Sequence, residues 1–241
     1  MALELPPFML FDLDDTILEY ERHAAASWNV VANDALAEDP NLDRDALYTR
    51  LMFHRKAFWK NQGNVVRGRL NLVWARRMVI AASYSDLGLE PSSRISAMAE
   101  HYEQTRENAI RPFPKALETI KRIAAGNSLL GMVTNGAGPI QRAKIRRFDL
   151  ERYFQIIVVE GEFGVGKPDP APFQQALNVL GSMPDETWMI GNDLVNDIAP
   201  AMALGISTVW VDWDQRGLPS DTPVQPNRIV SKIADLISPS Y

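Results

Sequence analysis

The chain has 241 residues, of which 46% are apolar and 23% charged, and its formal net charge is −5. These values are ordinary for a globular protein with one large domain or two smaller ones. The acidic balance suggests no broad basic face and therefore argues against a nucleic acid polymer as a partner.

The sequence also limits the expected compartment. It contains no cysteine, which excludes disulfides, thiolate metal sites and cysteine nucleophiles and fits a reducing cytoplasm. No apolar run approaches the roughly 18 residues that a membrane-spanning helix needs, and the first residues lack the basic segment of a signal peptide. We therefore expect a cytoplasmic protein without a membrane partner.

The first predicted element is a buried strand at residues 8–13, where the apolar side chains barely alternate, as in a parallel strand covered on both faces. Residues 17–110 follow without a convincing strand, but with apolar residues at three- and four-residue spacing. So long a stretch indicates an all-helical domain inserted into a core formed by residues 1–16 and 111–241. The helices predicted in it span residues 24–37, 44–59, 70–84 and 93–109.

From residue 112 onward, predicted helices and strands alternate, which is typical of a parallel α/β sheet. Proline stands at or near the start of the first three helices, a position that suits its fixed φ angle. The helices span residues 114–125, 139–148, 172–180 and 195–204, and the strands span residues 128–134, 154–159, 187–190 and 207–211.

Ligands of open parallel sheets bind beyond the carboxyl ends of the strands, so the residues after each strand are the candidates. The first strand ends in the segment that carries Asp12, Asp14 and Thr16. Two carboxylates about 4 Å apart repel by roughly 4 kcal/mol at an effective dielectric constant near 20. A divalent cation and a nearby lysine would offset that cost. A turn capped by Asp and Thr is the alternative interpretation.

The next two strands are followed by groups that suit an anion. Thr134 offers a hydroxyl, and Asn135 and Gly136 offer successive backbone N–H groups ahead of a helix N-terminus. Lys167 lies in the stiff loop 164–170 between glycines and prolines, where it could touch both a phosphate and the acidic residues. Taken singly, a simple turn and a solvated lysine are the favoured interpretations.

The fourth strand is followed by Gly191, Asn192 and Asp193, and Asp197 comes one helical turn later. Asp193 would add a carboxylate beside the first strand, and Asp197 could hold Lys167 or the neighbouring loops. A helix N-cap aspartate is the alternative. The specific signal is the combination, because acid, hydroxyl, lysine and acid follow four strands at one edge of the sheet.

This combination resembles the haloacid dehalogenase-like hydrolase superfamily, and the stretches VTNGAGPIQRAKIRRFDLERYF and GVGKPDPAPF are similar to its phosphatase subgroup. The resemblance implies a Rossmann-like α/β core and an inserted helical cap of the first type, which closes over the site. It implies that Asp12 is the nucleophile and Asp14 the general acid/base. Thr134, Lys167 and the backbone N–H of Asn135 would hold the phosphate.

The resemblance also implies Mg²⁺ as the cofactor, bound by the Asp12 carboxylate, the Asp14 backbone carbonyl and an acidic group of the fourth family motif, which is the segment Gly191–Asp197. Here the sequence departs from the common pattern, since many members have Gly-Asp where this chain has Gly191-Asn192. Asp193 is preferred over Asn192 as the metal ligand because it carries a charge.

The expected activity is Mg²⁺-dependent hydrolysis of a small phosphorylated metabolite, such as a nucleotide or a sugar phosphate, through an aspartyl-phosphate. Thr16 and Asp197 are expected to support the site. A 2-haloacid dehalogenase shares the fold but can dispense with the acid at Asp14, and a phosphomutase stays open as an alternative. A phospho-acceptor receiver would be about half this length, and a silent scaffold would not be expected to keep all four motifs.

Substrate choice is expected to lie in the helical insertion. Arg67 and Arg69, on either side of Gly68, could reach a second anionic group, and Trp59 could stack on a base or a sugar. The simpler interpretation is that Trp59 fills the helical core and that the two arginines face solvent.

Overall fold

The computed structural model describes residues 5–90 and 92–237. It divides the chain into two compact units, the first formed by Met1–Glu19 and Arg111–Tyr241 and the second by Tyr20–Ile110. The first boundary follows Glu19 rather than residue 16, because Leu18–Glu19 (β2) pairs in antiparallel fashion with Arg111–Pro112 (β3). This short ribbon joins the two chain segments that lead into and out of the helical unit.

The first unit is built on a sheet of six parallel strands in the order β5-β4-β1-β6-β7-β8. The central strand β1 pairs with β4 on one side and β6 on the other, so the strand order reverses there, which is where open α/β sheets bind ligands. The predicted α/β fold with a parallel sheet is confirmed. The strands are β1 (Phe8–Phe11), β4 (Leu129–Thr134), β5 (Ile156–Val159), β6 (Thr187–Gly191), β7 (Ser207–Val211) and β8 (Arg228–Val230).

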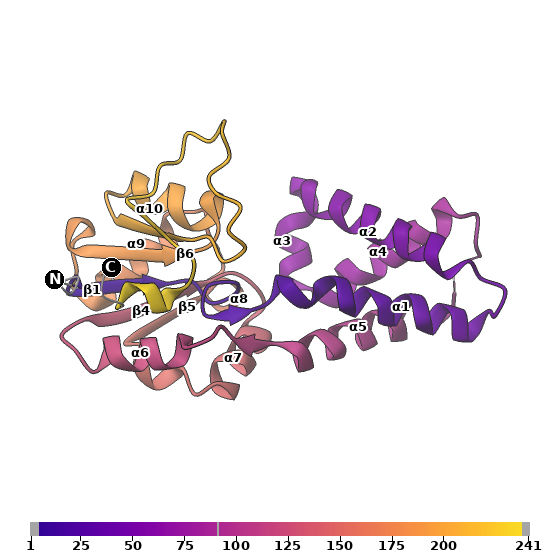
Figure 1. Cartoon of the computed structure of the whole chain (residues 1–241), viewed down its shortest axis with the longest axis horizontal. Helices are drawn as coiled ribbons and strands as arrows, with labels where there is room; N and C mark the ends of the chain where they lie inside the picture. The colour runs from indigo at the N-terminus through magenta and orange to yellow at the C-terminus, as the bar shows by residue number, and fades with distance from the viewer. Residues whose placement is uncertain (1–4, 91, 238–241) are drawn as a thin grey trace. The chain divides into compact units, whose positions relative to one another are not determined.

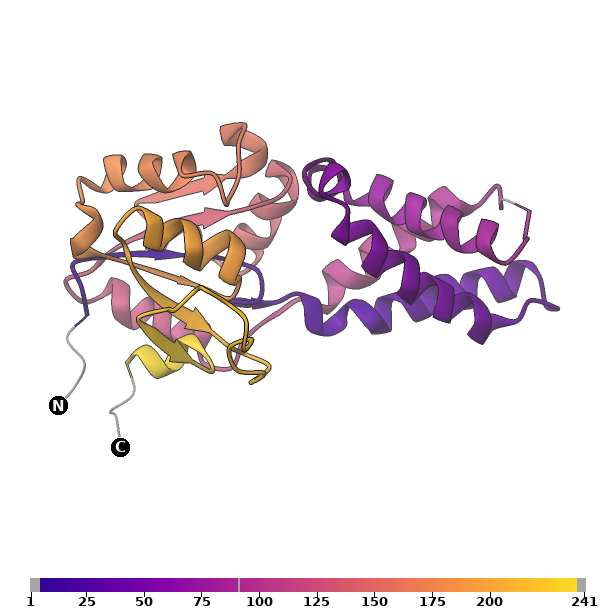
Figure 2. The same ribbon diagram turned by 90° about the horizontal axis from the view of Figure 1, so that it is seen from above.

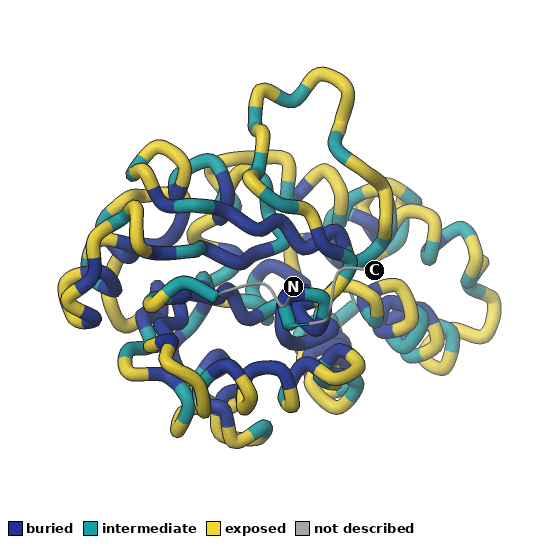
Figure 3. Tube along the Cα trace, turned by 60° about the vertical axis from the view of Figure 1, so that its left-hand side comes forward, coloured by how far each residue is buried: buried dark blue, intermediate teal, exposed yellow. Residues whose placement is uncertain are grey.

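Helices cover both faces of this sheet (Figure 1). On one face, α9 (Ala171–Leu180) and α10 (Ala199–Ala203) bury Phe173, Leu177 and Ala201 against Leu10 and Met189 of the strands. On the other face lie α6 (Ala116–Ala124) and α7 (Gly138–Arg147), and the short α8 (Glu160–Phe163) follows β5. The strands are accordingly buried along most of their length (Figure 3), which explains why their sequences barely alternate.

The second unit is all helical, and its helices pack side by side (Figure 2). Trp28, Leu51, Val79 and Tyr102 lie fully buried between them. The helices are α1 (Ala24–Glu38), α2 (Arg44–Lys60), α3 (Gln62–Leu70), α4 (Leu72–Asp86) and α5 (Ile95–Ala109). The sequence predicted four of the five and missed α3, which contains two glycines and buries only Gly68.

Asparagine and aspartate caps set the starts of α2, α3 and α4. The side chains of Asp43, Asn61 and Asn71 accept hydrogen bonds from backbone N–H groups of the following first turns, which otherwise lack partners within the helix. In the part of the chain that the structure describes, no helix combines the length and the apolar character needed to cross a bilayer.

Candidate active site

Asp12 lies directly after β1, and its backbone N–H donates to Ile190 O of β6 at 2.9 Å. The side chain is 10% exposed. Lys167 Nζ donates to Asp12 Oδ1 at 2.6 Å, and Thr16 Oγ1 lies 3.3 Å from Asp12 Oδ2. The centre of the sheet therefore presents a fixed, buried carboxylate beside a buried ammonium group.

Lys167 is positioned through its backbone as well as its side chain. The Asn135 side chain donates to Lys167 O at 2.8 Å and accepts from Lys167 N at 2.8 Å, which joins the loop after β4 to the lysine loop. A Cβ at Gly166 would lie 2.5 Å from Asn135 Oδ1, so this close approach requires glycine. The side-chain role of Asn135 was not predicted, since the sequence pointed only to its backbone N–H.

Asp197 completes a buried triad, because Lys167 Nζ donates to Asp197 Oδ1 at 2.6 Å as well as to Asp12. The second Asp197 oxygen, Oδ2, accepts the backbone N–H of Asp193 at 2.9 Å. A Cβ at Gly191 would overlap the Asp197 carboxylate, so the end of β6 must be glycine. The sequence-based expectation that Asp197 could hold Lys167 matches this contact.

Burial and opposing charges shift the pKa values of this triad. Burial raises the pKa of Asp197 to about 7, although the Lys167 charge opposes this and Asp12 adds to it. Burial likewise raises the pKa of Asp12, although Lys167 lowers it. Burial alone would lower the pKa of Lys167, but Asp12 and Asp197 together raise it above its ordinary value. One ammonium group thus faces two carboxylates, and the triad can carry excess negative charge.

Asp14 points to a different set of partners from those of Asp12. Lys144 Nζ lies 2.8 Å from Asp14 Oδ1 and 2.6 Å from Oδ2, and Gln141 Nε2 donates to Oδ2 at 3.1 Å. Gln141 Nε2 also donates to Thr134 Oγ1 at 2.7 Å. Sequence reasoning missed Gln141 and Lys144. One signal was present in the sequence. Gln141, Lys144 and Ile145 are spaced so that they share one face of the helix, and the apolar Ile145 indicates that this face is buried.

The side chains of Asn192 and Asp193, which directly follow β6, have different hydrogen-bond partners. Asn192 Oδ1 lies 3.3 Å from Thr16 Oγ1, whereas the Asp193 carboxylate accepts from the backbone N–H groups of Val195 and Asn196 at 2.8 and 3.0 Å. Asp193 is therefore the N-cap of the π-helical turn Leu194–Ile198. Thr16 Oγ1 contacts both Asp12 Oδ2 and Asn192 Oδ1. The side-chain oxygen of Asn192, and not one of Asp193, is therefore linked to Asp12 through Thr16.

The residues predicted for substrate choice all belong to the helical unit. The Arg67 guanidinium lies 4.0 Å from the centre of the Trp74 ring, and Trp59 packs beside Phe58 against the helical core. Arg69 is half-buried on the same helix. The packing of Trp59 agrees with the simpler interpretation of that side chain, whereas the exposed Arg67 contacts Trp74 rather than solvent alone.

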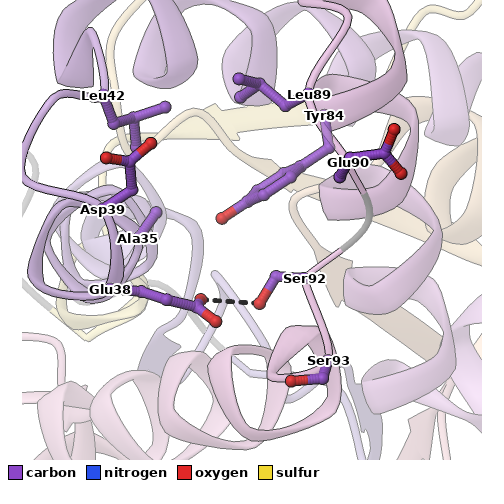
Figure 4. Close-up of a pocket in the computed structure, with 9 residues that line it drawn as sticks. All are labelled: Ala35, Glu38, Asp39, Leu42, Tyr84, Leu89, Glu90, Ser92 and Ser93. Carbon is purple, nitrogen blue, oxygen red and sulfur yellow. Dashed lines mark hydrogen bonds between the residues drawn. The ribbon is translucent and has the colours of Figure 1, made fainter.

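A hollow of ≈ 450 Å³ also lies within the helical unit, where the Tyr84 ring points away from Glu90 toward the side formed by Ala35 and Glu38 (Figure 4). Ser92 Oγ donates to Glu38 Oε2 at 2.6 Å across its floor. Burial raises the pKa of Tyr84, and the charges of Glu38 and Asp39 add to this. None of the residues predicted for the site lines this hollow.

Comparison with known proteins gives a consistent picture. Residues 9–211 match the family model described as haloacid dehalogenase-like hydrolase. The phosphoserine phosphatase of Thermus thermophilus is 27% identical over 247 aligned residues, which cover 95% of this chain and 96% of that protein. The pyrimidine 5′-nucleotidase YjjG of Escherichia coli is 30% identical over 165 residues, or 68% of this chain and 66% of that protein.

A solved structure supports the fold independently. The crystal structure of the HAD-hydrolase YfnB from Bacillus subtilis, bound to magnesium, superposes with a TM-score of 0.73 at 23% identity and covers 97% of each chain. At this identity, the likeness concerns the fold.

Proposed function

The chain belongs to the haloacid dehalogenase-like hydrolase family, and we propose that it is a Mg²⁺-dependent phosphatase that cleaves small phosphate monoesters through an aspartyl-phosphate on Asp12. The observation that carries this proposal is the 2.6 Å contact between Lys167 Nζ and Asp12 Oδ1 in a buried site. An anionic nucleophile repels an anionic substrate, so a fixed ammonium group beside it is what phosphoryl transfer requires.

In the first step, a carboxylate oxygen of Asp12 attacks phosphorus, and the bond from phosphorus to the ester oxygen breaks. Asp14 donates a proton to the departing oxygen, so that the product leaves as an alcohol. Lys167, Thr134 and the backbone N–H of Asn135 hold the phosphoryl oxygens. The triad geometry supports this step because Lys167 stays charged between two carboxylates.

In the second step, water attacks the phosphorus of the aspartyl-phosphate, and the bond between phosphorus and the Asp12 oxygen breaks. Asp14, now ionised, takes a proton from that water. Inorganic phosphate leaves and the Asp12 carboxylate is restored. Splitting the reaction in this way replaces one difficult displacement by two easier ones.

The oxygen atoms near Asp12 fit Mg²⁺. Described residues offer no group of three or more His, Cys, Asp or Glu side chains suited to a metal, so an all-protein cage is not present. Mg²⁺ normally keeps several waters and takes few protein ligands. We propose the Asp12 carboxylate, the Asp14 backbone carbonyl and Asn192 Oδ1 as its protein ligands.

This assignment revises the preference for Asp193. Its carboxylate is engaged by the N–H groups of the following turn, whereas Asn192 Oδ1 shares Thr16 Oγ1 with Asp12. Asp193 then acts by holding the turn that carries Asp197. When bound, Mg²⁺ would neutralise negative charge on the phosphoryl group and on Asp12.

The proposed substrates are small phosphorylated metabolites, including nucleotides and sugar phosphates. Relatives named for phosphoserine and for pyrimidine nucleotides support this class. We propose that Tyr20–Ile110 is the cap that selects among them, because this insertion begins only four residues after Thr16. The absence of cysteine supports a cytoplasmic location.

A panel of phosphorylated metabolites, screened for phosphate release with Mg²⁺ and with EDTA, tests the proposal. We expect release from several monoesters and from p-nitrophenyl phosphate, with Mg²⁺ required. Release of halide from 2-haloacids without release of phosphate from the esters would assign the chain to dehalogenation instead. A phosphoenzyme that forms but does not turn over would indicate a phospho-acceptor.

A further inference from the structure

Two polar side chains of α7 face inward, where a helix of this kind usually carries apolar residues. Gln141 is 2% exposed and Lys144 is 6% exposed. Lysine is rarely so deeply buried unless it is paired, and the burial of an unpaired ammonium group costs several kcal/mol. These two residues therefore have a use that offsets the cost, and their contacts show where it lies.

Both residues converge on the carboxylate of Asp14. Lys144 Nζ donates to both of its oxygens, at 2.8 and 2.6 Å, and Gln141 Nε2 donates to Oδ2 at 3.1 Å. A carboxylate that receives donors on both oxygens cannot rotate about its terminal bond without losing a charge-assisted hydrogen bond. The plane of the Asp14 carboxylate is therefore fixed from α7.

Gln141 also connects this carboxylate to the phosphate-holding residue. The same Nε2 atom lies 2.7 Å from Thr134 Oγ1 and 3.1 Å from Asp14 Oδ2. One side-chain amide thus spans the loop after β1 and the end of β4. A shift of Asp14 relative to Thr134 would break one of these two bonds.

We propose that Gln141 and Lys144 form a clamp that positions Asp14 for proton transfer to the leaving group and couples its position to that of Thr134. The inference rests on the proposed function, since it assigns positioning residues to the same reaction. The clamp is proposed to act through Asp14 and Thr134, which it contacts. Its contribution is orientation, and misplacement of a catalytic group by about 1 Å can cost roughly 10²-fold in rate.

The dependence of kcat/KM on the leaving group tests the clamp, because a merely structural role would not change this dependence. Phenolate from phenyl phosphate needs a proton far more than p-nitrophenolate does, so the value of kcat/KM for phenyl phosphate reports the proton transfer. We expect Lys144→Met to lower kcat/KM for phenyl phosphate by about 10²-fold and for p-nitrophenyl phosphate by less than about tenfold. Arg146→Met, on an exposed position of the same helix, is the matched control and should change neither value.

A double variant tests whether Lys144 acts through Asp14. In the Asp14→Asn background, the further change Lys144→Met should cost little more for phenyl phosphate, since the group being positioned is already lost. Additive losses in the double variant, or equal losses for the two esters in Lys144→Met, would overturn the inference. Absence of phosphate release by the unaltered protein would instead overturn the proposed function.

Two further variants keep the test decisive if Lys144→Met does not fold, which circular dichroism would reveal. Lys144→Arg keeps a charged donor and should restore most of the activity toward phenyl phosphate. Gln141→Leu keeps the volume but removes the donor that joins Thr134 and Asp14, and it should again affect phenyl phosphate more than p-nitrophenyl phosphate. A Gln141→Leu variant with unaltered leaving-group dependence would contradict the clamp.

Discussion

The two units of this chain bury charge in different ways. In the helical unit, Arg76 Nε donates to Glu103 Oε1 at 2.7 Å, and the Arg76 guanidinium lies 4.7 Å from the centre of the Tyr102 ring. Arg76 and Glu103 form a one-to-one ion pair beside Tyr102. The buried Arg106 of the same unit donates to Tyr102 Oη, Tyr20 O and Glu21 Oε2, so the charges in this unit are held by contacts within the unit.

The core unit instead gathers unequal numbers of charges at the carboxyl ends of its strands. Three carboxylates, from Asp12, Asp14 and Asp197, meet the two ammonium groups of Lys144 and Lys167. This excess of negative charge is costly in a buried place and is offset when a cation binds there. We therefore propose that the excess of carboxylates in the core unit serves ligand binding, whereas the Arg76–Glu103 pair stabilises the fold.

The largest effect expected from this contrast concerns Asp12. Asp12→Asn should lower phosphate release by at least about 10⁴-fold, because the nucleophile is lost, while the free energy of unfolding stays near that of the unaltered protein. Release assays and denaturant titration on the same preparations measure both quantities. Substantial turnover in Asp12→Asn would remove this residue from its proposed role.

Removal of the metal should be the next largest effect. EDTA is expected to lower turnover by about 10³-fold, since a bound cation supplies several kcal/mol of transition-state stabilisation, and excess Mg²⁺ should restore it. Ca²⁺ serves as the control, because it prefers more ligands and longer distances. Full activity in EDTA would take the metal out of the mechanism and leave the charge excess without its proposed function.

Substitutions in the Arg76–Glu103 pair should have the reverse effect: they should lower the stability of the fold and leave kcat nearly unchanged. Arg76→Met alone should lower the free energy of unfolding by about 3–5 kcal/mol, since it leaves Glu103 buried and unpaired. Replacing both, as Arg76→Met with Glu103→Leu, should recover most of that loss, and kcat should change little in either variant. A double variant as unstable as the single one would show that the pair is more than a packing element.

The raised pKa of Asp197 gives a smaller, pH-dependent effect. Because its pKa is about 7 in the folded protein and near 4 in an unfolded chain, the folded state binds more protons between these values. Its contribution to the free energy of unfolding therefore falls as pH rises from about 4 to 7, by about 1–3 kcal/mol. Denaturant titrations in EDTA should show this fall relative to Asp197→Asn, and parallel pH profiles would contradict it.

The smallest expected effect concerns Arg67, which stacks on Trp74. Arg67→Met should cost about 0.5–1 kcal/mol of stability, the usual contribution of an exposed cation–π contact, with KM unchanged. Lys60→Met, an exposed position of the same unit, is the control. A KM rise of more than about tenfold with unaltered stability would instead place Arg67 against the substrate, as one interpretation of the sequence had it.

Much of the core could be predicted from local patterns. The first strand and the acids at its end could be predicted because a parallel strand covered on both faces needs a continuous apolar run, and charged residues can begin only where that run ends. The observed strand is Phe8–Phe11, so the predicted range 8–13 extended two residues too far. The three-residue strand β8 and the ribbon of β2 and β3 were not predicted, since such short segments gain their hydrogen bonds from distant partners and carry no periodicity.

The sequence by itself determined the kinds of groups at the site, because aspartate, threonine and lysine follow the predicted strands. The different directions of the Asn192 and Asp193 side chains, the side-chain contacts of Asn135 with Lys167 and the convergence of Gln141 and Lys144 on Asp14 were decided only in the folded chain. The physical reason is that a side chain's direction depends on the competing donors around it, and these donors come from segments more than 100 residues apart in the case of Asp14 and Lys144.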